Sequence, residues 1–296
     1  MTKAEAAKAL DRFVEVNNEA NEKLDAKLIG TVETGPLGAA DGAGLRARRA
    51  VEPGGNPDFK ALALTDRRFL IPRQIGWPKW FVADVAPRVG GAAGGPNRWL
   101  MVFERDGAGE AWRVPYVTAV RASAVPEFTR DAEGHVEPVA ADASGLVVDP
   151  GELSTAYTGY LGKADAEDAA LFAPGSNTSQ LITSRAKNAR TTESATQYAD
   201  QPAAKGDFAP LGLRTADGGA LVFFASHHTA KITMLRPGVT PRLDAYTKAL
   251  MTGTAKKSVT LGRVARQAVL VPAKKDGGGQ VVFLSRTVGL VAARGE

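Results

Sequence analysis

Few side chains in this sequence could do acid–base or metal chemistry, because it holds three histidines and no cysteine. His227 and His228 are neighbours in a strand-like segment, where successive side chains point to opposite faces, so they cannot hold one metal ion together. His135 lies apart in a loop-like segment, and no HExxH frame is present. We therefore predict no metal site. One ring of the pair should face the core or a pocket and the other solvent, and we take His227 as the candidate binding residue.

Asp84 is the best-placed carboxylate for general-base chemistry, because it lies in the apolar strand-like segment Trp80–Val85. An isomerase of this kind needs a base beside a neutral hydrogen-bond donor in a dry pocket, and Tyr116 or a neutral histidine could be that donor. The spacing fixes no such pair. We favour the alternative that Asp84 lies on an exposed strand face or ends the strand.

Motifs for nucleophiles and for phosphate-binding loops are missing. Gly175-Ser176-Asn177-Thr178-Ser179 does not match GxSxG, and the glycine-rich segment Gly90–Pro96 lacks the lysine of a phosphate loop. The absence of cysteine excludes thiolate nucleophiles, disulfides and iron–sulfur clusters. We predict no catalytic residue and no cofactor.

All four tryptophans lie in the first half, at Trp77, Trp80, Trp99 and Trp112, and Tyr116 follows them. These rings could line a concave pocket for an apolar or ring-shaped ligand, so we take all five as candidate binding residues. The alternative, which we favour for most of them, is that they form the core of a small domain. Trp77 is the exception, because its loop-like Gly-Trp-Pro context favours an exposed, adhesive ring.

The charge pattern argues against a nucleic-acid partner. The net charge is +5, the acids and bases are interleaved, and no basic stripe appears. The arginines at 46, 48, 49, 67, 68 and 73 are interpreted as a solvated strand face, with contact to anionic polymers or lipid headgroups as the weaker alternative. No apolar run reaches the roughly 18 residues that span a bilayer. Met1-Thr2-Lys3 leads directly into a polar helix, so we expect no signal peptide within the chain.

The first half is predicted to begin with a helix and to continue as strands. Thr2-Lys3-Ala4-Glu5 fits a capping box, and apolar residues at three- and four-residue spacing extend the helix to Gly30 or Gly35-Pro36. Alternating patterns then predict strands. Their ranges are Leu45–Val51, Lys60–Leu64, Trp80–Val85, Arg98–Phe103 and Ala111–Val120.

The second half repeats this order after Val136–Gly145, which is interpreted as a linker. Asp149 and Pro150 predict a helix start, and Ala164–Phe172 and Ser179–Tyr198 are further helical segments. Strands are predicted at Phe208–Thr215, Ala220–Met234, Ser258–Val271 and Gln280–Ala292.

Local echoes accompany the repeated order and favour a diverged duplication. Arg105–Glu110 is echoed by Lys275–Gln280, and Ala61–Asp66 by Leu211–Asp217. The prediction is therefore an α+β protein with two tandem domains, residues 1–143 and 144–296. Each would pack N-terminal helices on a curved antiparallel sheet.

The element order resembles the cone-shaped fold of nuclear transport factor 2 and ketosteroid isomerase. Phe13…Asn17-Asn18-Glu19-Ala20-Asn21 and Arg68-Phe69-Leu70-Ile71-Pro72-Arg73…Gly76-Trp77-Pro78-Lys79-Trp80-Phe81 are similar to an uncharacterised domain of actinobacterial secreted lipoproteins. That resemblance covers most of the chain. It implies a protein lipid-anchored outside the cell membrane, with the lipidated leader absent from this chain, and it implies no chemistry.

Together these observations predict a non-catalytic binding or interaction protein, the soluble part of a cell-surface lipoprotein. Its partner would be an unknown protein or a small apolar ligand, bound at the aromatic-rich sheet and the Gly76–Trp80 loop. The alternative is a small-molecule carrier, or an isomerase- or dehydratase-like enzyme, that uses a pocket in one cone. A cytoplasmic location is not excluded by the sequence.

Overall fold

The first helix, α1 (Lys3–Lys23), starts at the predicted capping box in the computed structural model, which describes residues 1–163, 170–274 and 278–296. Thr2 accepts from the Glu5 amide, and the Glu5 carboxylate accepts from the Thr2 amide. The helix ends earlier than predicted, at Leu24, which adopts a left-handed conformation with φ of 53°. Asp25 then caps a separate short helix, α2 (Ala26–Ile29), by accepting from two amides. The capping residue inside the apolar pattern is what divides the predicted helix.

The predicted strand Leu45–Val51 is wrong, because this segment is the end of helix α3 (Gly35–Val51). Pro36 occupies the first turn of α3, where its missing amide hydrogen costs nothing. The buried side chains Leu37, Ala40, Ala43 and Ala47 follow helical spacing, and the alternation over the last residues is a short coincidence.

The first sheet is antiparallel, in the order β1-β2-β4-β5, with the short β3 pairing β2. Most of the predicted strands of this half are confirmed, with shifted ends. Their bounds are β1 (Leu62–Leu70), β2 (Lys79–Val89), β3 (Ala92–Ala93), β4 (Asn97–Arg105) and β5 (Arg113–Arg121). A register shift opposite Val102 and Glu104 turns the start of β5. Tyr116 and Val120 therefore face the second sheet, while Trp112 and Val114 face the helices.

The second sheet follows the order β10-β12-β11-β9-β8-β6, with β7 on β9, and only β10–β12 is parallel among the described pairs. Its strands are β6 (Pro138–Val139), β7 (Ser194–Ala203), β8 (Leu211–Arg214), β9 (Ala220–Met234), β10 (Met251–Gly253), β11 (Ser258–Val271) and β12 (Val282–Gly295). The predicted helix Ser179–Tyr198 is correct only for α6 (Ser179–Asn188), because β7 follows it. The apolar residues of β7, at positions 195, 198, 199 and 203, recur at three- and four-residue spacing as they would on a helix, and this obscured the strand.

Short helical segments complete the fold: α4 (Leu153–Lys163), α7 (Ala245–Ala249) and the 3-10 turns at Ala122–Ala124, Pro150–Glu152 and Gly206–Phe208. Asp149 precedes the second of these turns without a side-chain cap. The predicted helix Ala164–Phe172 and the turn Lys275–Gln280 lie largely outside the described residues. No helix among the described residues has the length and apolar character needed to cross a bilayer.

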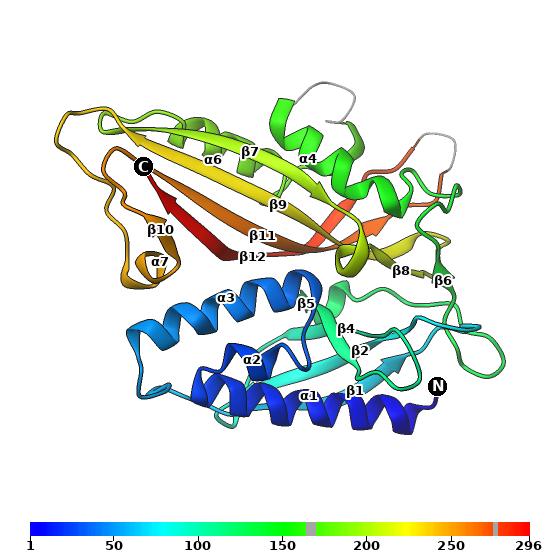
Figure 1. Cartoon of the computed structure of the whole chain (residues 1–296). Coiled ribbons are helices and arrows are strands. Elements are labelled where there is room, and N and C mark those ends of the chain that lie inside the picture. Colours follow the sequence, from blue (N-terminus) through cyan, green and yellow to red (C-terminus); the bar gives the residue numbers. More distant parts are fainter. Residues whose placement is uncertain (164–169, 275–277) are drawn as a thin grey trace.

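The two sheets form separate layers, with the second sheet above the first in Figure 1. They share one central core. Helices α1 and α2 cover the outer face of the first sheet, and α4 covers the outer face of the second. Between the sheets lies the shared core, built from both halves. Its buried members are Leu70, Trp80, Val82, Leu100, Val102, Tyr116, Val120, Val136, Ala203, Leu213, Leu221, Phe223, Ala225 and Ala268.

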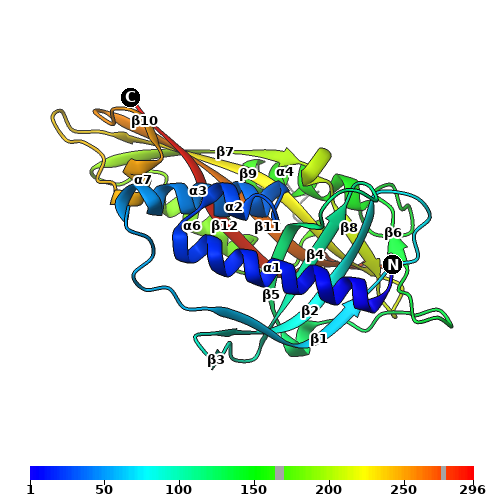
Figure 2. The same ribbon diagram turned by 60° about the horizontal axis from the view of Figure 1, so that its bottom comes forward.

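Helix α3 lies beside β5 and packs on β11 and β12, so it belongs spatially to both halves (Figure 2). The segment predicted as a linker also joins the second sheet, because β6 pairs with β8. The structure is thus mixed α and β with curled antiparallel sheets, as predicted. The division at residue 143 stays a prediction.

Candidate functional site

A cavity of about 390 Å³ lies where α1, α3, the first sheet and the second sheet meet. We call it the Glu33 cavity. Helix α1 contributes Phe13 and three asparagines, α3 contributes Leu37 and Asp41, and the second sheet contributes Arg266 and Thr287. The other lining residues are Glu33, Asn56, Phe59, Lys60, Leu62, Val89, Trp99, Val117 and Ala119. Its walls come from residues more than 250 positions apart in the chain.

Glu33 is the unusual group of this cavity. It precedes Thr34, the N-cap of α3, and a backbone bridge to Val114 of β5 fixes its position. Only 3% of its surface is accessible, and its Oε2 atom makes no hydrogen bond to any described residue. Burial raises the pKa of Glu33 well above its ordinary value, the Asp41 carboxyl raises it further, and Arg266 opposes the shift. A buried carboxyl without a partner costs stability, so its presence needs an explanation.

Asp41 and Arg266 complete the charged part of the cavity. The Nη1 atom of Arg266 lies 3.4 Å from Oδ1 of Asp41, which is a long contact for a charged pair. Protein atoms enclose Asp41 on most sides, and burial raises its pKa against the effect of Arg266. Its side chain nevertheless keeps 44% of its accessible surface, because it borders the cavity. Arg266 is buried, and its Nε atom has no partner among the described residues.

The asparagines of α1 hold the cavity wall in place. Asn18 donates to the Leu62 carbonyl at 2.9 Å and accepts from the Leu62 amide at 2.8 Å. Asn21 donates to the backbone carbonyl and side-chain oxygen of Asn17. The bonds of Asn18 tie α1 to the beginning of β1, and those of Asn21 stay within the helix. Asn18 and Asn21 are therefore already engaged, and the carboxyls and the arginine supply the free polar chemistry.

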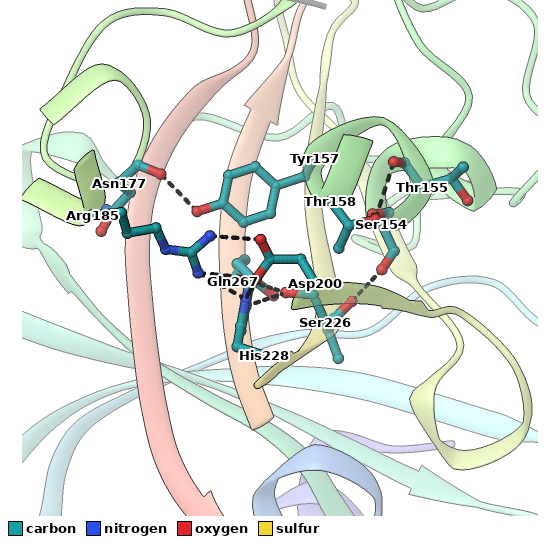
Figure 3. Close-up of polar contacts among 11 residues, drawn as sticks. Ser154, Thr155, Tyr157, Thr158, Asn177, Arg185, Asp200, Ser226, His228 and Gln267 are labelled. Carbon is teal, nitrogen blue, oxygen red and sulfur yellow. Dashed lines mark hydrogen bonds and ion pairs between the residues drawn. The ribbon is translucent and has the colours of Figure 1, made fainter. Parts of the chain in front are cut away.

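A second constellation has the residue types of a nucleophile triad, and we call it the buried polar cluster (Figure 3). The Nε2 atom of His228 lies 2.8 Å from Oγ of Ser226, and Nδ1 lies 2.5 Å from Oδ1 of Asp200. Arg185 holds Asp200 with two hydrogen bonds, at 2.5 Å and 2.9 Å. Gln267 of β11 approaches Ser226 at 2.6 Å.

The buried polar cluster is sealed, and its hydrogen bonds oppose nucleophilic catalysis. Ser226 has no accessible surface, whereas a nucleophile must reach its substrate. When the Gln267 amide faces the carbonyl oxygens of Phe224 and Ala265, its own oxygen accepts the Ser226 hydroxyl hydrogen. The proton of Ser226 is then directed away from His228. We conclude that the cluster joins β7, β9, β11 and α6 as a structural network.

The charges within this network follow from burial. Burial lowers the pKa of His228, and the hydrogen bond to Asp200 opposes this shift. Burial raises the pKa of Asp200, but hydrogen bonds from His228 and Arg185 outweigh it and leave that pKa below its ordinary value. The network thus contains a buried ion pair between Asp200 and Arg185, with His228 bonded to the same carboxylate.

Asp84, the sequence candidate for a general base, is buried and not exposed as expected. The Arg98 guanidinium is bonded to the Asp84 carboxylate and reaches Asp66 on the neighbouring strand. Tyr116 lies in the shared core, where its hydroxyl donates to the carbonyls of Phe208 and Ala209 at 3.0 Å. The two are not a base and donor in one pocket, so an isomerase site built on them is not found.

The structure places the predicted binding residues in separate regions. Trp99 lines the Glu33 cavity, whereas Trp80 joins Tyr116 in the shared core. Trp77 and Trp112 meet at Arg105, whose guanidinium carbon lies 4.7 Å and 4.9 Å from the two ring centroids.

The remaining sequence candidates lie elsewhere. His227 is half-buried against Phe208, with ring centroids 5.3 Å apart. The opposite orientation of the two histidines is confirmed, although the more buried ring is that of His228. Asp131, Glu133 and His135 place ligand atoms within 4.8 Å of one another. Arg73 already neutralises both carboxylates of this exposed group, at 2.8 Å and 2.6 Å.

Sequence reasoning missed Glu33, Asp41 and Arg266. Each is an ordinary charged residue in its local sequence, without a motif around it. A usable signal was the spacing of Glu33, Leu37 and Asp41, which places two acids around an apolar residue at helical intervals. The contribution of Arg266 depends on the packing of the two sheets and had no local signal.

Comparison with known proteins gives family relationships and no activity. A family described as "Domain of unknown function (DUF8094)" matches residues 1–295. An uncharacterized lipoprotein of Streptomyces avermitilis is 46% identical over 294 residues, covering 99% of this chain and 86% of that protein. Two uncharacterized lipoproteins of Streptomyces coelicolor are 44% and 27% identical, over 100% and 99% of this chain and 86% and 81% of their own lengths. No solved structure matches the chain.

Proposed function

Since this chain belongs to the DUF8094 family, whose relatives include Streptomyces lipoproteins, we propose that it is the protein part of a membrane-anchored, surface-exposed lipoprotein. Its function in this proposal is to bind a small organic molecule in the Glu33 cavity without converting it. The lipoprotein names of relatives that align over nearly the whole chain support the location.

The observation that carries the binding proposal is the unpartnered, buried Glu33 at the side of an open cavity. Buried polar groups in folded proteins are nearly always hydrogen-bonded, and exceptions often mark functional positions. A volume of about 390 Å³ also falls within the usual range for small-molecule sites. Apolar walls with a few convergent polar groups are the common composition of such sites.

We propose binding without catalysis because of the side chains that line the Glu33 cavity. Glu33 could act as an acid or base, but Asp41 beside it contacts Arg266, and the described lining residues include no histidine, serine or tyrosine to act with it. The triad-like group of the second sheet is sealed away from solvent. A carrier or receptor therefore fits the described residues better than an isomerase or dehydratase.

A fragment screen tests this proposal. Ligand-observed NMR would compare wild-type protein, the cavity-filling variant Ala119→Trp, and the matched control Ala93→Trp on an exposed hairpin strand. We expect fragments that bind wild-type and control protein and are lost from Ala119→Trp. Fragments that bind all three proteins equally, or no bound fragments at all, would reject the Glu33 cavity as the site.

Contact with a partner protein through the Gln74–Pro78 loop is the second candidate function. Ile75 is fully exposed and Trp77 is 41% exposed, and Lys79 and Arg105 hold the indole in place. A photo-crosslinking residue at Ile75 of the anchored lipoprotein should give a discrete adduct on cells, and one at the exposed Val89 should not. Equal labelling from both positions would reject the loop as a contact surface. Trp80 is unsuitable for this test, because its removal would damage the shared core.

A further inference from the structure

We propose that the ligand of the Glu33 cavity carries a protonated primary amine, which pairs with Glu33, and an aromatic or branched apolar portion, which packs between α1 and the first sheet. This inference rests on the proposed binding function and adds the chemical class of the ligand.

The charged groups that act on Glu33 are Asp41 and Arg266, and these two contact each other, so an ionised Glu33 has no cation within 4.0 Å among the described residues. Helix α3 contributes Asp41, strand β11 contributes Arg266, and Lys60 lies in the segment before β1. Arg266 is the only cation within 4.0 Å of Asp41 among the described residues, and it makes no such contact with Glu33. A ligand cation beside Glu33 would therefore complete a second pair next to the first.

The hydrogen-bonding capacity of Glu33 also favours an ammonium group. A carboxylate is a pure acceptor, and its Oε2 atom has no donor among the described residues. An ammonium group offers three donors and forms charge-assisted bonds, which are stronger than those of a neutral hydroxyl. An anionic group at Glu33 would be repelled by Glu33 and Asp41, and would bind only if it turned to Arg266 or Lys60 instead.

The apolar wall gives the rest of the ligand its character. Phe13 of α1, Leu37 of α3, Trp99 of β4 and Val117 of β5 line the same cavity. Trp99 is partly accessible, so its indole can stack with a ring or attract a nearby cation. A flat aromatic group joined to a short aminoalkyl chain would reach both this wall and Glu33.

Three probes of nearly equal shape separate the charge requirement from simple apolar binding. Tryptamine, indole-3-ethanol and indole-3-propionate differ in the group at the end of the same indole side chain, which is cationic, neutral or anionic. Isothermal titration of the full chain at pH 7 should show tryptamine binding at least about tenfold more tightly than indole-3-ethanol, with indole-3-propionate the weakest.

Two variants assign the charge effect to Glu33. Glu33→Gln keeps the size of the side chain and should weaken tryptamine at least about tenfold, while binding of indole-3-ethanol changes less than about twofold. Glu15→Gln removes the same charge from an exposed position of α1 and should change neither. The comparison of the three probes on wild-type protein does not depend on the folding of either variant.

The outcomes separate this inference from the proposed function. If indole-3-ethanol or indole-3-propionate binds wild-type protein as tightly as tryptamine, the amine requirement is wrong while the cavity remains a binding site. Tryptamine binding that survives Glu33→Gln unchanged would overturn the assigned contact. If none of the three binds, the inference is also overturned, and the Ala119→Trp screen decides separately whether the cavity binds other molecules.

Discussion

At the scale of single residues, the Glu33 carboxyl shows how a binding site can oppose folding. Its burial has no compensating bond within the described chain, so the ionised form is disfavoured in the folded state. Strained or unpaired groups of this kind are retained where function requires them. The same carboxyl that the ligand would contact is therefore a source of instability in the empty protein.

The first prediction concerns Glu33→Gln and pH. Because the folded pKa of Glu33 is raised above its ordinary value near 4.5, the stability associated with its proton is fully present below pH about 4.5 and is lost as pH rises through the raised pKa. We expect Glu33→Gln to melt at a higher temperature than wild type at pH 8, and the difference to vanish by pH 4. Asp41 and Arg266 are present in both proteins, so their own titration does not account for the difference in melting temperature.

Differential scanning calorimetry across this pH range measures the effect, with Glu15→Gln as the exposed control. A constant difference at all pH values would show that the pKa of Glu33 is the same in the folded and unfolded states, against the argument from burial. A lower melting temperature for Glu33→Gln at pH 8 would contradict the argument from burial.

The second prediction concerns Asp200→Ala in the buried polar cluster. Removing this carboxylate leaves Arg185 and His228 without their charged partner in a buried site. We expect a loss of about 3–5 kcal/mol in the free energy of unfolding, measured by urea denaturation. Asp11→Ala breaks the exposed pair with Arg67 and should cost no more than about 1 kcal/mol. Equal losses in the two variants would place Asp200 in a solvated environment.

Sequence patterns could not distinguish candidate binding residues from core residues, for a physical reason. Aromatic rings serve cores and binding surfaces equally well, so Trp80 and Tyr116 in the shared core could not be told from Trp99 in the cavity. The chemistry of Glu33 comes from the absence of a partner, which is a property of packing. No local pattern encodes it.

At the scale of secondary-structure elements, helix α3 determines how the two sheets meet. It contacts α2 and β5 on one side and β11 and β12 on the other. Close approach to β12 depends on Gly289, because a Cβ atom built there would lie 2.5 Å from the Cβ of Ala40. Glycine weakens a strand in general, so its presence here reflects the helix that crosses it.

The third prediction follows from this close approach. Gly289→Ala should destabilise the protein by about 1–3 kcal/mol, because α3 must move away from the sheet. Gly262→Ala on β11 is the matched control, since its nearest side-chain contact, the Cβ of Ala292, lies at an ordinary 3.7 Å. Chemical denaturation would compare the two, and a loss as large in Gly262→Ala would exclude the α3 contact as the cause.

Elements with long, regular patterns were predictable, and elements set by tertiary packing were not. The predicted ranges of β9 and β11 match the structure at both ends, because their alternating apolar residues contact buried layers on two sides. The strand predicted for Leu45–Val51 and the helix predicted across β7 failed where the apolar signal was weak or short. Packing on α4 and β9 determines β7.

At the scale of the whole molecule, the two halves are joined by more than the polypeptide connection. The shared core takes side chains from both halves, and the Tyr116 hydroxyl donates to the backbone carbonyls of Phe208 and Ala209. Strand β6 lies within residues 1–143 but pairs with β8 of the second sheet. Each half also has its own cluster, facing its own helices. The likeness to the cone-shaped fold of nuclear transport factor 2 and ketosteroid isomerase stays a prediction, because no solved structure matches the chain.

The fourth prediction concerns cooperativity between the halves. Because the shared core would be exposed if either half opened alone, we expect the chain to unfold as one unit. Hydrogen exchange read by mass spectrometry should give the same opening free energy for the central strands β4 and β11. A lower value for one of them would show that residues 1–143 and 144–296 open independently.

The uneven placement of tryptophan gives the molecule an optical property. All four indoles lie in the first half, and Trp99 is the one that borders the Glu33 cavity. Light absorbed by tryptophan is therefore emitted from around the first sheet, and a non-fluorescent guest entering the cavity would change the polarity around Trp99. Replacing Trp99 with phenylalanine removes that part of the emission, so the difference between the two spectra isolates the signal of an occupied cavity.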